Sequence, residues 1–131
     1  MLCEHMSKSP GLKFDYDSGC LIVTITGRYI LEHKEEAFKS IAAAIKAKPV
    51  KAALIDMRGL QNPYGFMDRY KMGEYAGHYL TAVPIGCLGH EQQFDPGRIG
   101  KVVANNRGAR VELFTDEAAG YAWLKQYQTG S

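Results

Sequence analysis

Residues 52–60 read Ala-Ala-Leu-Ile-Asp-Met-Arg-Gly-Leu, an apolar run that gives way to a carboxylate, a cation and a glycine. The apolar part lacks polar alternation, which is typical of a strand covered on both faces and lying inside a parallel sheet. We expect this strand to end at Asp56. Open α/β sheets place their functional groups beyond the carboxyl ends of such strands, so Asp56 and Arg58 are the first candidates for a site.

Strands and helices alternate on both sides of this segment. Two runs with a two-residue period, 12–16 and 20–26, flank Asp17-Ser18-Gly19 and predict a β-hairpin. The order of the predicted elements is β-β-α-β-α-β-α-β-α. It predicts an α/β fold with a single mixed, mostly parallel five-stranded sheet and four helices. The remaining elements are expected as helices over about 35–48, 66–80, 96–107 and from 117, and as strands over 85–88 and 110–114.

The 3.6-residue period predicts the side chains that each helix buries. Asp95-Pro96 is expected to start the third helix and Gly108 to stop it. In the second helix, the glycines of the inward stripe are expected to allow a close approach to the sheet. The predicted inward residues are Phe38, Ile41, Ala42 and Ile45; Phe66, Tyr70, Gly73, Gly77 and Leu80; Ile99, Val102 and Val103; and Ala118, Tyr121 and Ala122 with Leu124 or Trp123.

Length and composition are those of an ordinary globular chain. Its 131 residues are 46% hydrophobic and 23% charged, which suffices for one core without disulfides or metal. We expect one domain over residues 11–128, with polar tails at 1–10 and 129–131. The net charge of +2 comes from scattered cations, so nothing indicates a nucleic-acid partner.

Cysteine and histidine usage points to no cofactor. Cys3, Cys20 and Cys87 form no Cys-x-x-Cys pair, and an odd number cannot close a disulfide framework. The four histidines show no metal-ligand spacing. No run approaches the ~20 apolar residues of a membrane span, and residues 1–10 lack the apolar core of a signal peptide. We expect a cytoplasmic protein without metal, and buried roles for Cys20 and Cys87.

The element order and the C-terminal third of the chain resemble the STAS / SpoIIAA-like group, the anti-sigma-factor-antagonist fold, and especially its uncharacterised members. The resemblance covers about residues 12–127, and its tail motif is Val-Ala-Asn-Asn-Arg-Gly at 103–108, Val-Glu-Leu-Phe-Thr-Asp-Glu at 111–117 and Ala-Trp-Leu at 122–124. It implies a non-enzymatic regulatory module that binds a protein partner.

In antagonists of this type, the turn after the third strand reads approximately Asp-Ser-Ser-Gly-Leu, and a serine there accepts phosphate from a partner kinase. Asp56, Gly59 and Leu60 match that pattern, but Met57 and Arg58 stand where the hydroxyl residues would be. Neither side chain can be phosphorylated. The resemblance therefore implies a module that lacks the phosphate switch.

A second group of candidates follows the fourth strand. His90 and Glu91 are expected at the same sheet edge as Asp56, Arg58 and Gly59, where they would form a turn that meets a partner or a crevice for a small anion or lipid. Two interpretations of Arg58 stay open: a contact to an anionic ligand, or an ion pair with Asp56 or Asp68. The sequence has no nucleophile elbow and no phosphate-binding glycine loop, so we expect no catalytic residues.

The second helix carries a possible interaction surface. Met72, Tyr75 and Tyr79 lie within about 60° of one another and opposite the predicted core stripe. Tyr64 lies in the loop before this helix. Tyrosine and methionine are enriched at interfaces, so these residues are expected to meet a protein partner or a second copy in a homodimer. The alternative is that the chain's own loops, such as 92–94, cover them.

Overall fold

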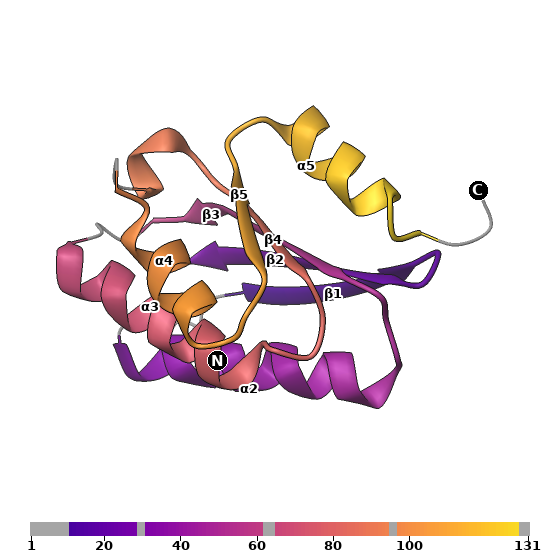
Figure 1. The fold of residues 1–131 in the computed structure, drawn as a ribbon, viewed down its shortest axis with the longest axis horizontal. Helices are drawn as coiled ribbons and strands as arrows, with labels where there is room; N and C mark the ends of the chain where they lie inside the picture. The colour runs from indigo at the N-terminus through magenta and orange to yellow at the C-terminus, as the bar shows by residue number, and fades with distance from the viewer. Residues whose placement is uncertain (1–10, 29–30, 62–64, 95–96, 129–131) are drawn as a thin grey trace, which may run out of the picture.

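The computed structural model describes residues 11–28, 31–61, 65–94 and 97–128 and shows a five-stranded sheet packed between helices (Figure 1). The predicted order of strands and helices is confirmed. The elements are β1 (Gly11–Asp17), β2 (Cys20–Gly27), α2 (Leu31–Ala47), β3 (Ala53–Leu60), α3 (Phe66–Tyr79), β4 (Ile85–Leu88), the 3₁₀ turn η1 (Glu91–Gln93), α4 (Ile99–Asn106), β5 (Val111–Phe114) and α5 (Glu117–Lys125).

The strands lie in the order β1-β2-β3-β4-β5, with β1 antiparallel to β2 and every other pair parallel. The predicted hairpin is confirmed: Ser18 and Gly19 have φ values of 52° and 85°, as a tight two-residue turn between twisted strands requires. The segment that opened the sequence analysis is the central strand, which explains its unbroken apolar run.

Three helices cover one face of the sheet, and a fourth helix covers the other. In Figure 1, α2, α3 and α4 lie on one face and α5 lies on the other. The larger core fills the side of α2, α3 and α4. The smaller core lies under α5 and consists of Cys20, Ala52, Leu54, Leu88 and Leu124. Alternation along β3 sends Leu54 to the smaller core and Ile55 to the larger one.

The central strand is longer than predicted. It was expected to end at Asp56, but it continues through Leu60. Its pairing with β4 does end at Asp56, whereas β2 continues alongside it as far as the Gly27–Leu60 pair, after a register shift between Thr24 and Thr26. Because β2 still offers backbone partners, the sequence Asp-Met-Arg-Gly remains extended instead of turning.

The glycines of α3 face a helix and not the sheet, so that part of the prediction was wrong. A Cβ built on Gly73 would lie 2.5 Å from the backbone oxygen of Gly100, and one built on Gly77 would lie 2.6 Å from Cβ of Arg107. The two positions therefore let α3 and α4 approach closely. The periodicity located the small stripe correctly, but it could not say which neighbour would pack on it.

Several other predicted inward residues are exposed. Phe66 is 61% exposed, because the first turn of α3 extends past the elements that cover the rest of the helix. Val102 is also exposed; Val103 is buried as predicted, and Ala104 is buried beside it. In α5 the buried stripe is Gly120 and Leu124, with Trp123 packed beside them; Ala118, Tyr121 and Ala122 are exposed. A helix alone on one face of a sheet buries only a narrow stripe.

The buried face of α2 agrees with the prediction. Ile41 and Ile45 are buried as expected, with Phe38 and Ala42 packed against the core.

The ends of α4 agree in part with the prediction. Gly108 follows α4 with a φ of 102°, which favours glycine. The expected start of α4 at Asp95 and Pro96 lies outside the described residues; Arg98 is the residue before its first turn.

Candidate functional site at the end of the central strand

Asp56 and Arg58 form a bidentate ion pair on the α5 side of β3. Arg58 donates from Nε to Oδ1 of Asp56 at 2.9 Å and from Nη2 to Oδ2 at 2.8 Å. The backbone N–H of Arg58 also donates to Oδ1, at 3.1 Å. Of the open interpretations of Arg58, the structure shows the ion pair with Asp56 and not one with Asp68.

A third member of the cluster comes from the last helix. Arg58 donates from Nη1 to Oε1 of Glu117 at 3.0 Å. Asp116 fixes this helix end, because its side chain accepts a hydrogen bond from the backbone of Ala119 at 3.0 Å. The sequence analysis assigned Glu117 only to the start of a helix. Since β5 is parallel to β3, the residues just after it lie at the same sheet edge, and that rule was sufficient to find Glu117.

The cluster holds its members in their charged forms. Hydrogen bonds from the Arg58 side chain lower the pKa of Asp56; partial burial opposes this shift, and the positive charges of Arg58 and His90 add to it. The same hydrogen bond to Asp56, followed by the one to Glu117, raises the pKa of Arg58. Burial, and then the negative charges of Asp56 and Glu117, raise the pKa of Tyr121. A carboxylate with a lowered pKa is a weak base, so the cluster is poorly suited to proton transfer.

His90 and Glu91 make contacts of their own beside this cluster. The backbone N–H of His90 donates to Oε1 of Gln93 at 2.6 Å, which closes the η1 turn. Glu91 pairs with Arg98 at 3.4 Å. Gly59 approaches β2, because a Cβ there would lie 2.7 Å from Cγ2 of Thr26. Of the predicted turn residues, only Asp56 and Arg58 touch each other in these contacts.

The side chains at positions 57 and 58, which match the phosphate switch of the antagonists, lie on opposite faces of the sheet. Arg58 joins the cluster on the α5 side, whereas Met57 is buried and lines a cavity on the side of α2, α3 and α4. A side chain at position 57 is therefore part of the interior. Only position 58 of this pair is half-exposed.

The tyrosines of α3 contact α2. The rings of Tyr75 and Phe38 lie 5.7 Å apart, and the Tyr79 hydroxyl donates to Oε2 of Glu35 at 2.7 Å, which raises the pKa of Tyr79 to about 12. Both tyrosines are half-buried. Tyr75 and Tyr79 thus pack against α2, and not against loops such as 92–94, which were the alternative. Tyr64 lies outside the described residues.

The most exposed apolar side chains of α3 lie at its start. Phe66 and Met67 are 61% and 63% exposed. Sequence reasoning missed this pair because the helical period assigned Phe66 to the core. The useful signal was positional: residues in the first turn of a helix that follows a long loop have fewer neighbours to cover them.

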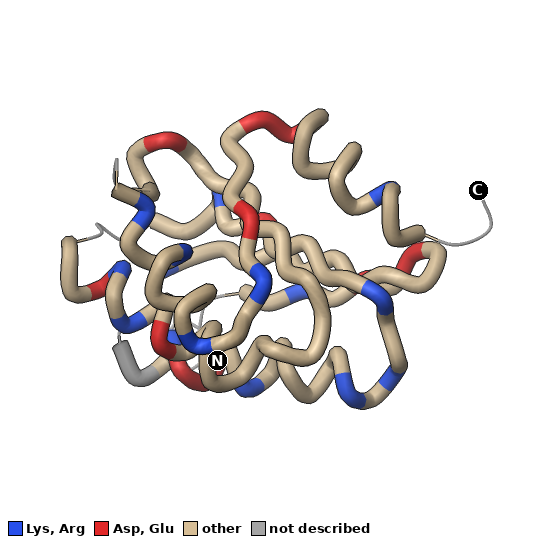
Figure 2. Tube along the Cα trace, viewed as in Figure 1, with Lys and Arg blue, Asp and Glu red and all other residues tan. Residues whose placement is uncertain are grey.

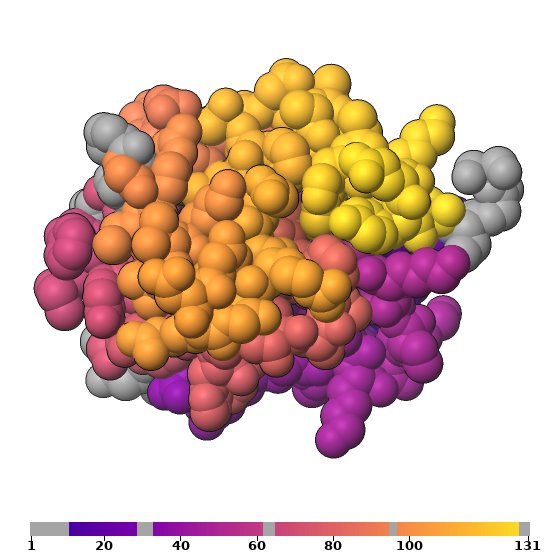
Figure 3. Space-filling view, in the orientation of Figure 1, coloured from indigo at the N-terminus to yellow at the C-terminus, as the bar shows by residue number. Residues whose placement is uncertain are grey.

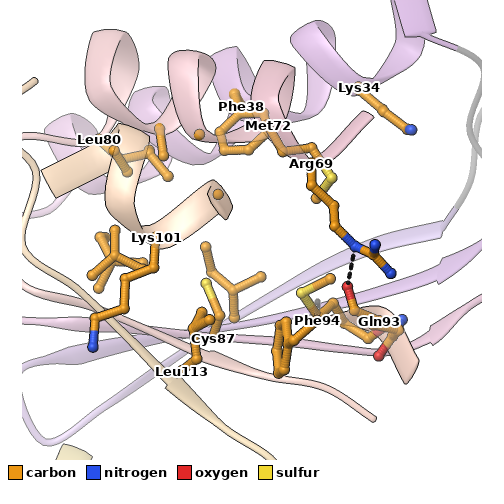
Figure 4. A pocket seen from close by; sticks show the side chains of 18 of the residues that line it. Lys34, Phe38, Arg69, Met72, Leu80, Cys87, Gln93, Phe94, Lys101 and Leu113 are labelled. Carbon is orange, nitrogen blue, oxygen red and sulfur yellow. Dashed lines mark hydrogen bonds between the residues drawn. The ribbon is translucent and has the colours of Figure 1, made fainter. Parts of the chain in front are cut away.

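A cavity of about 120 Å³ lies between the sheet and α2, α3 and α4 (Figure 4). Met72 of the predicted interaction surface lines it, as do Gln93 and Phe94. A small-ligand crevice was predicted at Arg58 and His90. The cavity instead lies across the sheet from the Arg58 side chain, because neighbouring residues of a strand point to opposite faces.

The two cysteines of the described residues are free thiols with raised pKa values. Burial raises the pKa of Cys87 to about 12 and is the main cause of the raised pKa of Cys20; both are free cysteines. Among the described residues, no group of three His, Cys, Asp or Glu side chains is arranged to hold a metal ion. No helix within the described ranges is long and apolar enough to cross a membrane. Figure 2 shows acidic and basic positions interspersed along the trace.

Comparison with known proteins identifies the fold. No protein-family model and no curated protein sequence matches this chain. Among solved structures, an anti-sigma factor antagonist from Mycobacterium paratuberculosis superimposes with a TM-score of 0.61 at 13% identity, covering 90% of this chain and 96% of that one. An uncharacterised DUF3478-family protein with a SpoIIAA-like fold, from Shewanella loihica PV-4, gives a TM-score of 0.51 at 20% identity, covering 88% and 94%. The chain has the SpoIIAA-like fold, as its sequence predicted.

Proposed function

We propose that this protein is a non-enzymatic regulatory module of the STAS/SpoIIAA-like type that acts by binding a protein partner. The observation that carries the proposal is the fold, which is shared almost end to end with an anti-sigma factor antagonist. The name of that neighbour describes an action on another protein.

The contacts of the Asp56 cluster support a role without catalysis. Asp56, Arg58 and Glu117 are bound to one another, so the most prominent polar groups at this sheet edge satisfy each other. The cluster connects β3 to the start of α5 and thereby fixes the shape of this edge. The free thiols of Cys20, which is buried, and Cys87, which is half-buried, agree with a reducing compartment such as the cytoplasm.

We further propose that the module works without the phosphate switch. No hydroxyl residue stands at 57 or 58, and the Met57 side chain is buried. Partner binding would then depend on the amount of protein present, or on a ligand, instead of on a kinase.

The partner surface in this proposal is the start of α3. Phe66 and Met67 are the exposed apolar residues there, and aromatic and methionine side chains are enriched in interfaces. Tyr75 and Tyr79 lie on another side of the helix, half-buried against α2, and Tyr64 precedes the helix in the sequence. A second copy of the chain is one form that such a partner can take.

A pair of matched variants tests the proposal. The double variant Phe66→Ser/Met67→Ser removes both exposed apolar side chains, and Val102→Ser makes the same kind of change at an exposed residue of α4. Proteins cross-linked to the wild-type chain in cells of its source are identified, and each candidate is purified for titration calorimetry. Light scattering coupled to size exclusion reports self-association.

We expect one partner to bind the wild type and the Val102 variant equally and to bind the double variant at least about tenfold more weakly, as loss of an interface anchor predicts. The melting temperature should stay unchanged. Equal affinity of all three proteins would place the partner surface elsewhere. If no purified candidate binds and the wild type is monomeric, the proposed function is wrong.

A small-anion role at Arg58 and His90 has less support. The Arg58 guanidinium already makes hydrogen bonds to two carboxylates, so an anionic ligand would have to displace one of them.

A further inference from the structure

The cavity under α3 is an apolar space that the proposed protein-binding role does not use. Its volume is about 120 Å³, and it is lined almost entirely by apolar atoms. Cys87 of β4 lies on its sheet side, and Phe38 and Met72 lie on its helix side (Figure 4). Ile55 and Met57 of β3 also line it. Pockets for small ligands are typically apolar and concave in this way.

The cavity exists because small residues line the helices above the sheet. The contact of Gly73 with Gly100 draws α3 and α4 together. Figure 3 shows these helices packed as one continuous surface on the outside. Beneath that surface, Ala37, Ala76 and Ala104 line the cavity with side chains too short to fill it. An empty apolar space forfeits packing contacts, so an apolar occupant would stabilise the fold.

The charged residues at the edge of the cavity all have the same sign. Four basic residues line it, and none of its lining residues is acidic. Three of them pair with carboxylates that do not line the cavity: Lys34 with Asp68, Arg98 with Glu91 and Lys101 with Glu112. The fourth is Arg69. The cavity therefore combines an apolar interior with an edge that favours negative charge.

Arg69 is bound differently from the other three. Its side chain extends from α3 across one end of the cavity toward Gln93 (Figure 4). It donates from Nε to the carbonyl of Gln93 at 3.2 Å and from Nη2 to that of Gln92 at 3.0 Å. Within the described ranges it makes no ion pair with a carboxylate. The backbone carbonyls hold the guanidinium in place without neutralising its charge.

We propose that this cavity binds a medium-chain fatty acid, with its hydrocarbon chain between the sheet and α3 and its carboxylate at Arg69. A guanidinium pairs with a carboxylate through parallel hydrogen bonds, and the apolar lining matches the chain. The volume limits the length: an engineered cavity of about 150 Å³ takes up the six carbons of benzene, so we expect no more than about six carbons of the chain to lie inside this smaller cavity. This inference goes beyond the proposed function and does not depend on it.

The test uses the five methionines of the chain as reporters. Protein with ¹³C-labelled methionine methyl groups is titrated with sodium octanoate and followed by two-dimensional NMR. Met57 and Met72 line the cavity, whereas Met67 is exposed and does not. We expect saturable shifts of the Met57 and Met72 signals and none of the Met67 signal.

Octanol and two arginine variants test the carboxylate contact. Octanol has the same chain without the charge, and should bind at least tenfold more weakly than octanoate. Arg69→Gln should weaken octanoate binding at least tenfold and leave octanol binding unchanged. Arg107→Gln is the matched control, because Arg107 pairs with Glu74 and does not line the cavity; its octanoate affinity should equal that of the wild type.

A filled cavity provides the second test. Ala76→Leu adds three carbons inside the cavity and should abolish the octanoate-induced shifts. Its melting curve checks that it folds, and if it does not, Ala104→Val serves instead. No saturable shift of Met57 or Met72 in the wild type would overturn the proposal, as would undiminished binding by a folded, filled variant. Equal affinities for octanoate and octanol would overturn the assignment of the carboxylate to Arg69.

Discussion

The two faces of the central strand use the same nine-residue segment in opposite ways. On the α5 side, Asp56 and Arg58 meet Glu117 and satisfy one another's charges. On the other side, Ile55 and Met57 border a cavity with the Arg69 guanidinium at one end, where backbone carbonyls hold it. The residues that look functional in the sequence thus stabilise each other, while residues that look like ordinary core border the space suited to a ligand.

Shortening a leucine on each face gives the largest expected effect. Leu54 is fully buried in the closed core under α5, and Leu80 lines the cavity. We expect Leu54→Ala to lower the free energy of unfolding by about 3–4 kcal/mol and Leu80→Ala by about 2–3 kcal/mol, because Leu80 has fewer neighbours to lose. Urea denaturation followed by circular dichroism measures both. The reverse order would contradict the contrast between a closed and an open core.

Glycine variants sharpen the same contrast. A Cβ at Gly73 would collide with a backbone oxygen of α4, whereas a Cβ at Gly120 of α5 would meet its nearest neighbour at 3.7 Å. Gly73→Ala should therefore destabilise by about 1–3 kcal/mol. Gly120→Ala should be neutral or stabilise by up to about 1 kcal/mol, since alanine is the better helix former. Thermal melts of the two variants measure this difference in stability. Equal melting temperatures would show that α3 and α4 can separate without cost.

Breaking the charged cluster should lower the free energy of unfolding by a smaller amount, and the loss should differ between its two ion pairs. Arg58→Met leaves Asp56 half-buried without its partner and should cost about 1–3 kcal/mol. Glu117→Gln removes a partner whose side chain is 61% exposed, and should cost about 0–1 kcal/mol. Chemical denaturation at low and high salt measures both losses. If the two variants lost the same free energy, the Asp56–Arg58 pair would have no special weight.

The pH dependence of stability gives the smallest expected difference. The pKa of Asp56 is lower in the folded protein than in the unfolded chain. Its stabilisation is therefore present above the unfolded pKa of about 3.9 and is lost as the pH falls through the folded value. Asp56→Asn should be less stable than the wild type at pH 7 and should lose less of its stability between pH 4 and pH 2.

Acid unfolding curves of the two proteins provide the measurement. Asp68 also has a lowered pKa: burial opposes that shift, and hydrogen bonds from the Gly65 backbone and Lys34 produce it. Part of the acid sensitivity should thus remain in the Asp56 variant. Parallel curves for variant and wild type would contradict a stabilising role for the Asp56 charge.

Local patterns in the sequence were enough to predict the fold. The order of elements follows from changes of period, from the turn at Ser18-Gly19 and from the stops at proline and glycine, all of which act over a few residues. The ion pair of Asp56 with Arg58 was one of the interpretations that the sequence left open, and it is possible because the two residues are neighbours on one face of a strand.

What the sequence could not show depends on contacts between distant segments. The partner of Gly73 is Gly100, and the second partner of Arg58 is Glu117. No local period records either contact, although the parallel order of β3 and β5 places Glu117 at the same sheet edge as Arg58. The cavity is harder still to predict, because its alanines, glycines and methionines have the composition of a filled core. Arg69, which lies at its edge, drew no attention among the scattered cations of the chain.

A crystal structure obtained in the presence of sodium octanoate tests the contrast between the two faces most directly. The account predicts density for one chain between β3 and α3, with its carboxylate at Arg69, and an unchanged cluster of Asp56, Arg58 and Glu117. Octanoate at Arg58, with that cluster opened and the cavity empty, would contradict it.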